Sequence, residues 1–141
     1  MKSETQEWVK KAEDDLRVAQ HEMEYDQPSY DAICFHSQQC AEKYLKGFLT
    51  EHAVEFPRTH MLVDLLMLCL EVDKEFESRR QDLEDLNVYG VQVRYPGFDA
   101  TIPAAKEAIA AATRVRDFAR SKLGIIEIKD DEQTDEGDDD M

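Results

Sequence analysis

A row of polar side chains along one segment is the first candidate for chemistry. The residues concerned, spaced three or four apart, are His36, Gln39, Lys43 and Lys46. If the segment is helical, they share one face and offer cationic and hydrogen-bonding groups to a phosphate or an RNA backbone. The alternative is a solvated face on which Glu42 pairs with Lys46 one turn away. Charged strips are usually solvated, so the pattern favours this second interpretation.

Two shorter stretches, expected at helix ends, also carry groups that bind anions. His60 follows Arg58 and Thr59 and is expected in the first turn of a helix, where backbone N–H groups favour anions. Arg94 could hold a phosphate through two hydrogen bonds, and Tyr95 could stack on a base. Alternatively, Arg94 binds the last carbonyls of its helix and Tyr95 packs in the core. The residues alone leave these two interpretations equal.

These groups together define one predicted ligand site. We expect the end of a fourth helix to lie beside the start of a third, with the lysines of the second helix close by. The predicted ligand-binding residues are Arg94, Tyr95, His60, Lys43, Lys46 and His36.

No enzyme signature accompanies this site. The sequence contains no phosphate-binding loop, dinucleotide fingerprint, H-E-x-x-H motif or nucleophile elbow. Its histidines, at positions 21, 36, 52 and 60, lack zinc-ligand spacing. A calcium loop starting at Glu132 would need a glutamate at its twelfth position, which lies beyond Met141. We therefore predict no catalytic residue, no metal and no cofactor.

The cysteines indicate buried thiols. Cys34, Cys40 and Cys69 are odd in number, form no C-x-x-C pair and lie among apolar residues. Reduced thiols are typical of the cytoplasm. Residues 1–24 are too charged for a signal peptide, and the longest apolar run, 61–70, is too short to span a bilayer. We predict a cytoplasmic protein with no membrane contact.

The charge is concentrated near the C-terminus. The 141 residues carry a formal net charge of −15, and residues 127–141, with nine acidic residues and one lysine, supply −8 of it. Like charges without apolar residues to bury predict disorder. We expect a helical domain at 1–123 and an acidic, disordered tail at 124–141. An acidic body also argues against binding long DNA.

Hydrophobic periodicity predicts five helices, at about 4–25, 29–52, 59–70, 74–93 and 101–123. Ser3, Ser29 and Thr59 are expected N-caps, and Pro103 fits the first turn of the last helix. The second helix has a broad apolar face, which predicts a central position. Short connections favour antiparallel neighbours, so the expected fold is an all-α, up-and-down bundle of four to five helices.

Four stretches, in this order, resemble the HEPN domain family. They are residues 8–16, residues 34–49, residues 60–66 and Arg94-Tyr95-Pro96, and they cover about 5–120. The resemblance implies a HEPN-like helical bundle, usually a homodimer. It also implies a toxin–antitoxin-type pairing with a minimal nucleotidyltransferase as partner.

The resemblance also bears on catalysis. Catalytic members are metal-independent ribonucleases that carry an arginine, then four to six residues, then a histidine. Here the seven residues after Arg94 contain no histidine, and Arg58 precedes His60 by only two positions. General acid–base cleavage of RNA would therefore lack its expected group. The chain resembles the non-catalytic branch.

The leading hypothesis is a homodimeric binding module for a nucleotide or RNA end, associated with a minimal nucleotidyltransferase. The acidic tail would mimic nucleic acid or occupy a basic surface on that partner. Two alternatives remain open: a metal-independent ribonuclease toxin with a non-standard Arg/His pair, and a structural helical adaptor without a ligand.

Overall fold

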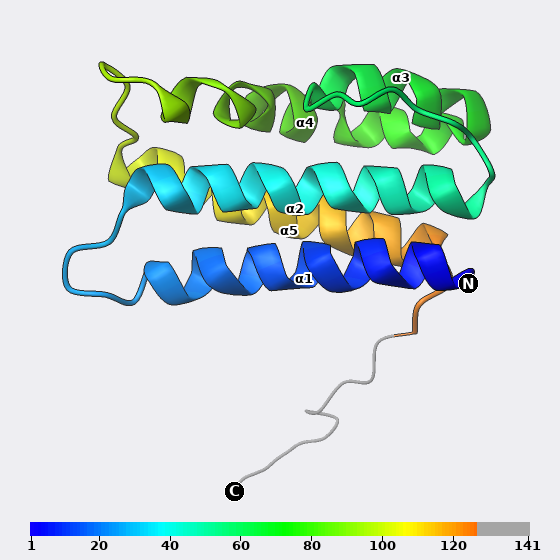
Figure 1. The fold of residues 1–141 in the computed structure, drawn as a ribbon, viewed down its shortest axis with the longest axis horizontal. Helices are drawn as coiled ribbons and strands as arrows, with labels where there is room; N and C mark the ends of the chain where they lie inside the picture. The colour runs from blue at the N-terminus through cyan, green and yellow to red at the C-terminus, as the bar shows by residue number, and fades with distance from the viewer. Residues whose placement is uncertain (127–141) are drawn as a thin grey trace, which may run out of the picture.

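The computed structural model describes residues 1–126, apart from the side chain of Arg94. Five α-helices make up the fold (Figure 1), which confirms the predicted all-helical bundle. They are α1 (Ser3–Glu22), α2 (Tyr30–Glu51), α3 (Leu62–Val72), α4 (Arg80–Asn87) and α5 (Ile102–Lys122). Most of the tail predicted to be disordered, residues 127–141, lies outside the described residues, and the boundary at 123 stays a prediction. No described helix is long and apolar enough to cross a membrane.

Helix α2 forms the centre of the bundle, as its broad apolar face predicts. It contacts α1, α3, α4 and α5. Its largest apolar side chains, Tyr44, Leu45, Phe48 and Leu49, are buried. Alanines at 105, 108, 111, 112 and 119 are buried on α5, and such small side chains let α5 approach α2 closely.

The chain does not simply alternate in direction between consecutive helices. Helices α1 and α2 are antiparallel, but the connection after α2 runs back along that helix (Figure 1). The Gln38 Nε2 atom, in the middle of α2, donates to the His60 carbonyl at 3.0 Å. Helix α3 therefore begins beside the middle of α2 and runs in the same direction. Phe56 anchors the connection by packing edge-on against Trp8, with ring centroids 6.2 Å apart.

The helix starts agree only in part with the predicted caps. Ser29 accepts a hydrogen bond from the Ala32 N–H at 3.2 Å, as predicted for an N-cap. The prediction for Ser3 was wrong, because α1 already includes it and Lys2 is the capping position, with no side-chain cap. The Lys2 N–H donates instead to Glu51 at 3.1 Å, which ties the start of α1 to the end of α2.

The predicted start of the third helix was also wrong. Helix α3 begins at Leu62, so His60 precedes the helix and does not lie in its first turn. Thr59 Oγ1 accepts from the Met61 N–H at 3.0 Å and turns the chain ahead of the helix. The Leu62 N–H donates to Asn87 Oδ1 at 2.7 Å. The backbone N–H groups of Met61 and Leu62 therefore bind side-chain oxygens of the protein, although N–H groups at this helix start were expected to attract an anion.

The predicted continuous helix at 74–93 is interrupted. Short 3-10 segments, η1 (Lys74–Arg79), η2 (Val88–Gly90) and η3 (Gln92–Arg94), flank α4. The Asp73 side chain caps the start of η1 by accepting a hydrogen bond from the Glu75 N–H at 2.9 Å. The segment nevertheless buries the apolar side chains of Phe76, Leu83 and Leu86.

All three cysteines are free and buried, as predicted. Burial raises the pKa of the Cys34 thiol to about 11 and that of Cys69 to about 12. Both thiols are therefore protonated and unreactive near neutral pH.

Candidate functional site

The polar row of α2, comprising His36, Gln39, Lys43 and Lys46, divides into two clusters. Each is built around a buried carboxylate that holds one lysine and one histidine. The Asp15 cluster consists of Asp15, His36 and Lys43. The Glu42 cluster consists of Glu42, Gln38, Gln39, Lys46 and His60.

The Glu42 carboxylate is almost completely buried, and four side chains bind it. Lys46 Nζ lies 2.8 Å from Oε2, and His60 Nδ1 lies 3.2 Å from each carboxylate oxygen. The Gln38 and Gln39 amides donate to Oε1 at 3.3 and 3.2 Å. Dense hydrogen bonding of this kind offsets the cost of burying the charge.

Lys46 is a structural counterion in this cluster. Its Nζ lies 5.6 Å from the Trp8 ring centroid and 5.8 Å from that of Phe56, and the residue is 8% exposed. The predicted pairing of Glu42 with Lys46 is therefore present, but the face is not solvated. Helix α1 and the connection that carries Phe56 cover it, so Lys46 is poorly placed to contact a ligand.

The Asp15 cluster joins α1 to α2. Asp15 binds His36 Nδ1 at 2.7 Å and Lys43 Nζ at 2.5 Å. Burial opposes ionisation of Asp15, but the hydrogen bonds from His36 and Lys43 outweigh it and lower its pKa below the ordinary 3.8. The His36 and Lys43 side chains are thus held against α1.

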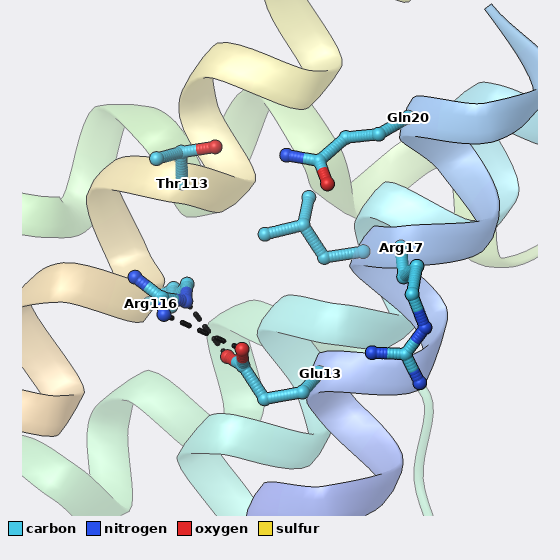
Figure 2. A pocket seen from close by; sticks show the side chains of 6 residues that line it. Glu13, Arg17, Gln20, Thr113 and Arg116 are labelled. Carbon is cyan, nitrogen blue, oxygen red and sulfur yellow. Dashed lines mark hydrogen bonds and ion pairs between the residues drawn. The ribbon is translucent and has the colours of Figure 1, made fainter. Parts of the chain in front are cut away.

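Asp15 and a second carboxylate of α1, Glu13, which binds Arg116 (Figure 2), predict a loss of stability in acid. The pKa values of Asp15 and Glu13 are lowered on folding, so each contributes stability that is fully present above its unfolded value, 3.8 or 4.5. That stability is lost as the pH falls through the lower folded values. We expect the melting temperature to decrease below about pH 4. A Glu13→Gln/Asp15→Asn double variant should melt lower at pH 7 and depend less on pH below 4; an unchanged acid dependence would contradict the assignment.

Gly90, in the segment that follows α4, packs against Gln38 of the Glu42 cluster. A Cβ atom at Gly90 would lie 3.0 Å from Gln38 Nε2 and 3.4 Å from the His60 carbonyl oxygen, so any side chain here would crowd the buried Gln38 amide. From Gly90 the chain continues through η3 to Tyr95. We call residues 88–95 the η2–η3 loop. The Glu42 cluster therefore positions both His60 and the beginning of this loop.

The rings of His60 and Tyr95 are open to solvent. The His60 side chain is 56% exposed although its Nδ1 contacts Glu42, and Tyr95 is 62% exposed. The alternative in which Tyr95 packs in the core was therefore wrong. Arg94 ends η3, and its side chain lies outside what the structure describes. Beyond Tyr95 the chain reaches the start of α2, where Asp31 accepts from the Ala100 N–H at 2.7 Å.

The structure thus brings together only part of the predicted site. His60, Lys46 and the start of the η2–η3 loop meet at Glu42, whereas His36 and Lys43 belong to the separate Asp15 cluster. Whether these residues bind a ligand stays a prediction. Among residues 1–126, no group of three or more His, Cys, Asp or Glu side chains is arranged to hold a metal ion.

Sequence reasoning missed Gln38, Asp15 and Gly90 as organising residues. Gln38 is fully buried on the central helix α2, and Asp15 lies beside the buried Ala12, Leu16 and Ala19 of α1. A polar residue in such a place is a usable signal, because buried polar groups require partners. The signal does not say which partner, since Asp15 and Lys43 are 28 positions apart.

Comparisons with known proteins agree on one family. A family model described as HEPN domain matches residues 5–122. A solved structure described as the crystal structure of ST0689, an archaeal HEPN homologue, is similar with a TM-score of 0.62 and 26% identity. The alignment covers 84% of this chain and 97% of that one. No curated protein matches.

Proposed function

Because this chain belongs to the HEPN domain family, we propose that it is a non-catalytic binding module for a nucleotide or RNA end. The ligand binds beside His60 and the η2–η3 loop. The observation that carries this proposal is the Glu42 cluster. Its carboxylate is buried and hydrogen-bonded to four side chains, whereas one of these, the His60 imidazole, is exposed beside the loop that contains Arg94 and Tyr95.

The histidine pattern supports the non-catalytic assignment. His60 is the last histidine of the chain, so none follows Arg94. Metal-independent RNA cleavage needs a positioned acid and base. His60 could serve as one of them, but its Nδ1 is occupied by the buried Glu42, and within residues 1–126 no second histidine is hydrogen-bonded to this carboxylate. Binding without turnover is the activity that these residues fit.

The exposed groups match the parts of a nucleotide. Tyr95 offers a ring on which a base can stack. Arg94 would contribute a guanidinium suited to two phosphate oxygens. His60 has its Nε2 edge left for a hydrogen bond, because Glu42 engages the other nitrogen. The net charge of −15 disfavours long nucleic acid, so a compact ligand is the better fit.

The wider setting is part of the same proposal. We infer a cytoplasmic homodimer that associates with a minimal nucleotidyltransferase in a toxin–antitoxin-type pair. The resemblance to the family supports this setting. Exposed apolar side chains at Met61 and Val91, next in the chain to His60 and Gly90, offer a surface for association.

Calorimetric titration with ATP, GTP and short RNAs tests the proposed site. Arg94→Ala should weaken binding by about 1.5–3 kcal/mol, the range for a hydrogen bond to a charged group. Arg80→Ala is the matched control, since Arg80 is a surface arginine on α4 that pairs with Glu77. If the wild type binds and Arg94→Ala binds equally well with an intact fold, the site lies elsewhere. If the wild type binds none of these ligands, the proposed function is wrong.

A further inference from the structure

Glu42 is surrounded by hydrogen-bond donors. Lys46 Nζ donates to its carboxylate at 2.8 Å, and the Gln38 and Gln39 amides donate at 3.3 and 3.2 Å. The Gln38 amide oxygen is turned the other way, where it accepts from Gln39 at 2.8 Å. The buried Lys46 ammonium also needs an ionised carboxylate as its partner. Glu42 is therefore an acceptor for every group that binds it, including His60.

This arrangement determines which ring nitrogen of His60 carries the proton. The imidazole Nδ1 lies 3.2 Å from both Glu42 oxygens, and it can bind an ionised carboxylate only by donating its hydrogen. The backbone of the same residue is also held, because its carbonyl accepts from Gln38 at 3.0 Å. Lys46 already balances the Glu42 charge, so a second positive charge is not needed here. In the neutral ring, Nε2 then carries a lone pair and is an acceptor.

The Nε2 atom of His60 is left for a ligand. Among the described residues 1–126, no group is hydrogen-bonded to this atom. The side chain is 56% exposed even though Nδ1 contacts a buried carboxylate. The cluster thus holds one accessible acceptor in a fixed orientation. Such an acceptor recognises a donor on the ligand and has no hydrogen to offer a phosphate oxygen.

The parts of a nucleotide differ in what they can offer this acceptor. Ionised phosphate oxygens only accept, so they suit the Arg94 guanidinium and not a neutral His60. A base stacked on Tyr95 is held by its face. The ribose hydroxyls can donate, and every ribonucleotide has them whatever its base. The ribose is therefore the part of the ligand that Nε2 fits best.

We propose that His60 Nε2 accepts a hydrogen bond from a ribose hydroxyl, so that the site selects ribonucleotides and RNA 3′ ends over their deoxyribose counterparts. This inference rests on the proposed function and makes His60 the residue that determines sugar specificity. Glu42 is the positioning residue, because it fixes the tautomer of the ring. The 2′-hydroxyl is the group by which proteins distinguish RNA from DNA. A terminal ribose has no phosphodiester on its 3′ side, so this hydrogen bond leads to no cleavage.

The tautomer can be measured without a ligand. Long-range ¹H–¹⁵N spectra of the ¹⁵N-labelled full chain at pH 8.5 distinguish protonated from unprotonated imidazole nitrogens. His60 should have a protonated Nδ1, whereas the exposed His21, whose ring has no bonded partner within residues 1–126, should show both tautomers. Glu42→Leu combined with Lys46→Met removes the acceptor, so His60 should then resemble His21. A protonated Nε2 in the wild type, or an unchanged tautomer in the double variant, overturns the inference and leaves the proposed function standing.

Calorimetric titration at the same pH tests the sugar specificity. AMP is compared with its 2′-fluoro-2′-deoxy and 3′-fluoro-3′-deoxy analogues, because fluorine is similar in size to a hydroxyl but cannot donate. At least one analogue should bind the wild type about tenfold more weakly than AMP. His60→Ala should bind AMP and both analogues with equal affinity. His21→Ala is the matched control and should keep the preference of the wild type.

The outcomes separate this inference from the proposed function. If the wild type binds AMP and both analogues equally, the inference is overturned, although a nucleotide still binds. A preference that persists in His60→Ala also overturns it, because another residue then accepts from the hydroxyl. A weaker affinity for IMP, with no loss for either fluoro analogue, overturns it in favour of a base amine. If AMP does not bind at all, the inference and the proposed function both fail.

Discussion

Glu42→Ala is expected to lower the free energy of unfolding by about 3–5 kcal/mol, the cost of removing one partner of a buried ion pair. The substitution leaves the Lys46 ammonium beneath Trp8 and Phe56 without its counterion. It also removes the acceptor of the Gln38 and Gln39 amides. Urea unfolding followed by circular dichroism measures the effect.

Two further variants separate the buried pair from ordinary charge effects. Glu77→Ala removes an exposed carboxylate bound to Arg80 at 2.6 Å and should cost less than about 1 kcal/mol. Glu42→Leu combined with Lys46→Met replaces both charges with apolar groups and should recover much of the loss. A single Glu42→Ala variant as stable as Glu77→Ala would show that the cluster does not organise the fold.

Phe76→Ala should destabilise the protein by a similar amount, about 3–5 kcal/mol. Phe76 is fully buried where η1 meets the core, with ring centroids 4.5 Å from Phe48 and 4.9 Å from Phe118. Truncation leaves a cavity between α2, η1 and α5 that rigid helices cannot close. The same unfolding measurement applies.

Tyr95→Ala is the matched aromatic control for Phe76. Tyr95 is 62% exposed, so its truncation should change the free energy of unfolding by less than about 0.5 kcal/mol. Equal losses for the two variants would mean that the η2–η3 loop packs more tightly than its exposure indicates.

The features that could be predicted from the sequence are those set by local spacing. The broad apolar face of α2 identified the central helix, and Ser29 identified its start. The Glu42–Lys46 pair followed from a separation of four residues. For the cap and the ion pair, the interacting groups are within about one turn of one another, so the pattern contains the whole interaction.

The features that could not be predicted depend on partners distant in the chain. The Leu62 N–H binds Asn87, and this contact moves the start of α3 past His60. Glu13 and Arg116 are 103 positions apart, so no periodicity connects them. Gly90 interrupts the expected fourth helix where it approaches Gln38. Such contacts arise only once the bundle has brought separate helices together.

A labelled RNA experiment tests the central claim, binding without catalysis, most directly. Full-length protein is mixed with short 5′-labelled RNAs in the presence of a chelator; fluorescence anisotropy reports binding, and a denaturing gel of the same samples reports cleavage. The account predicts saturable binding of RNA ends, competed by nucleotides, with the RNA left intact. Cleavage that disappears in both His60→Ala and Arg94→Ala would contradict it and identify a ribonuclease.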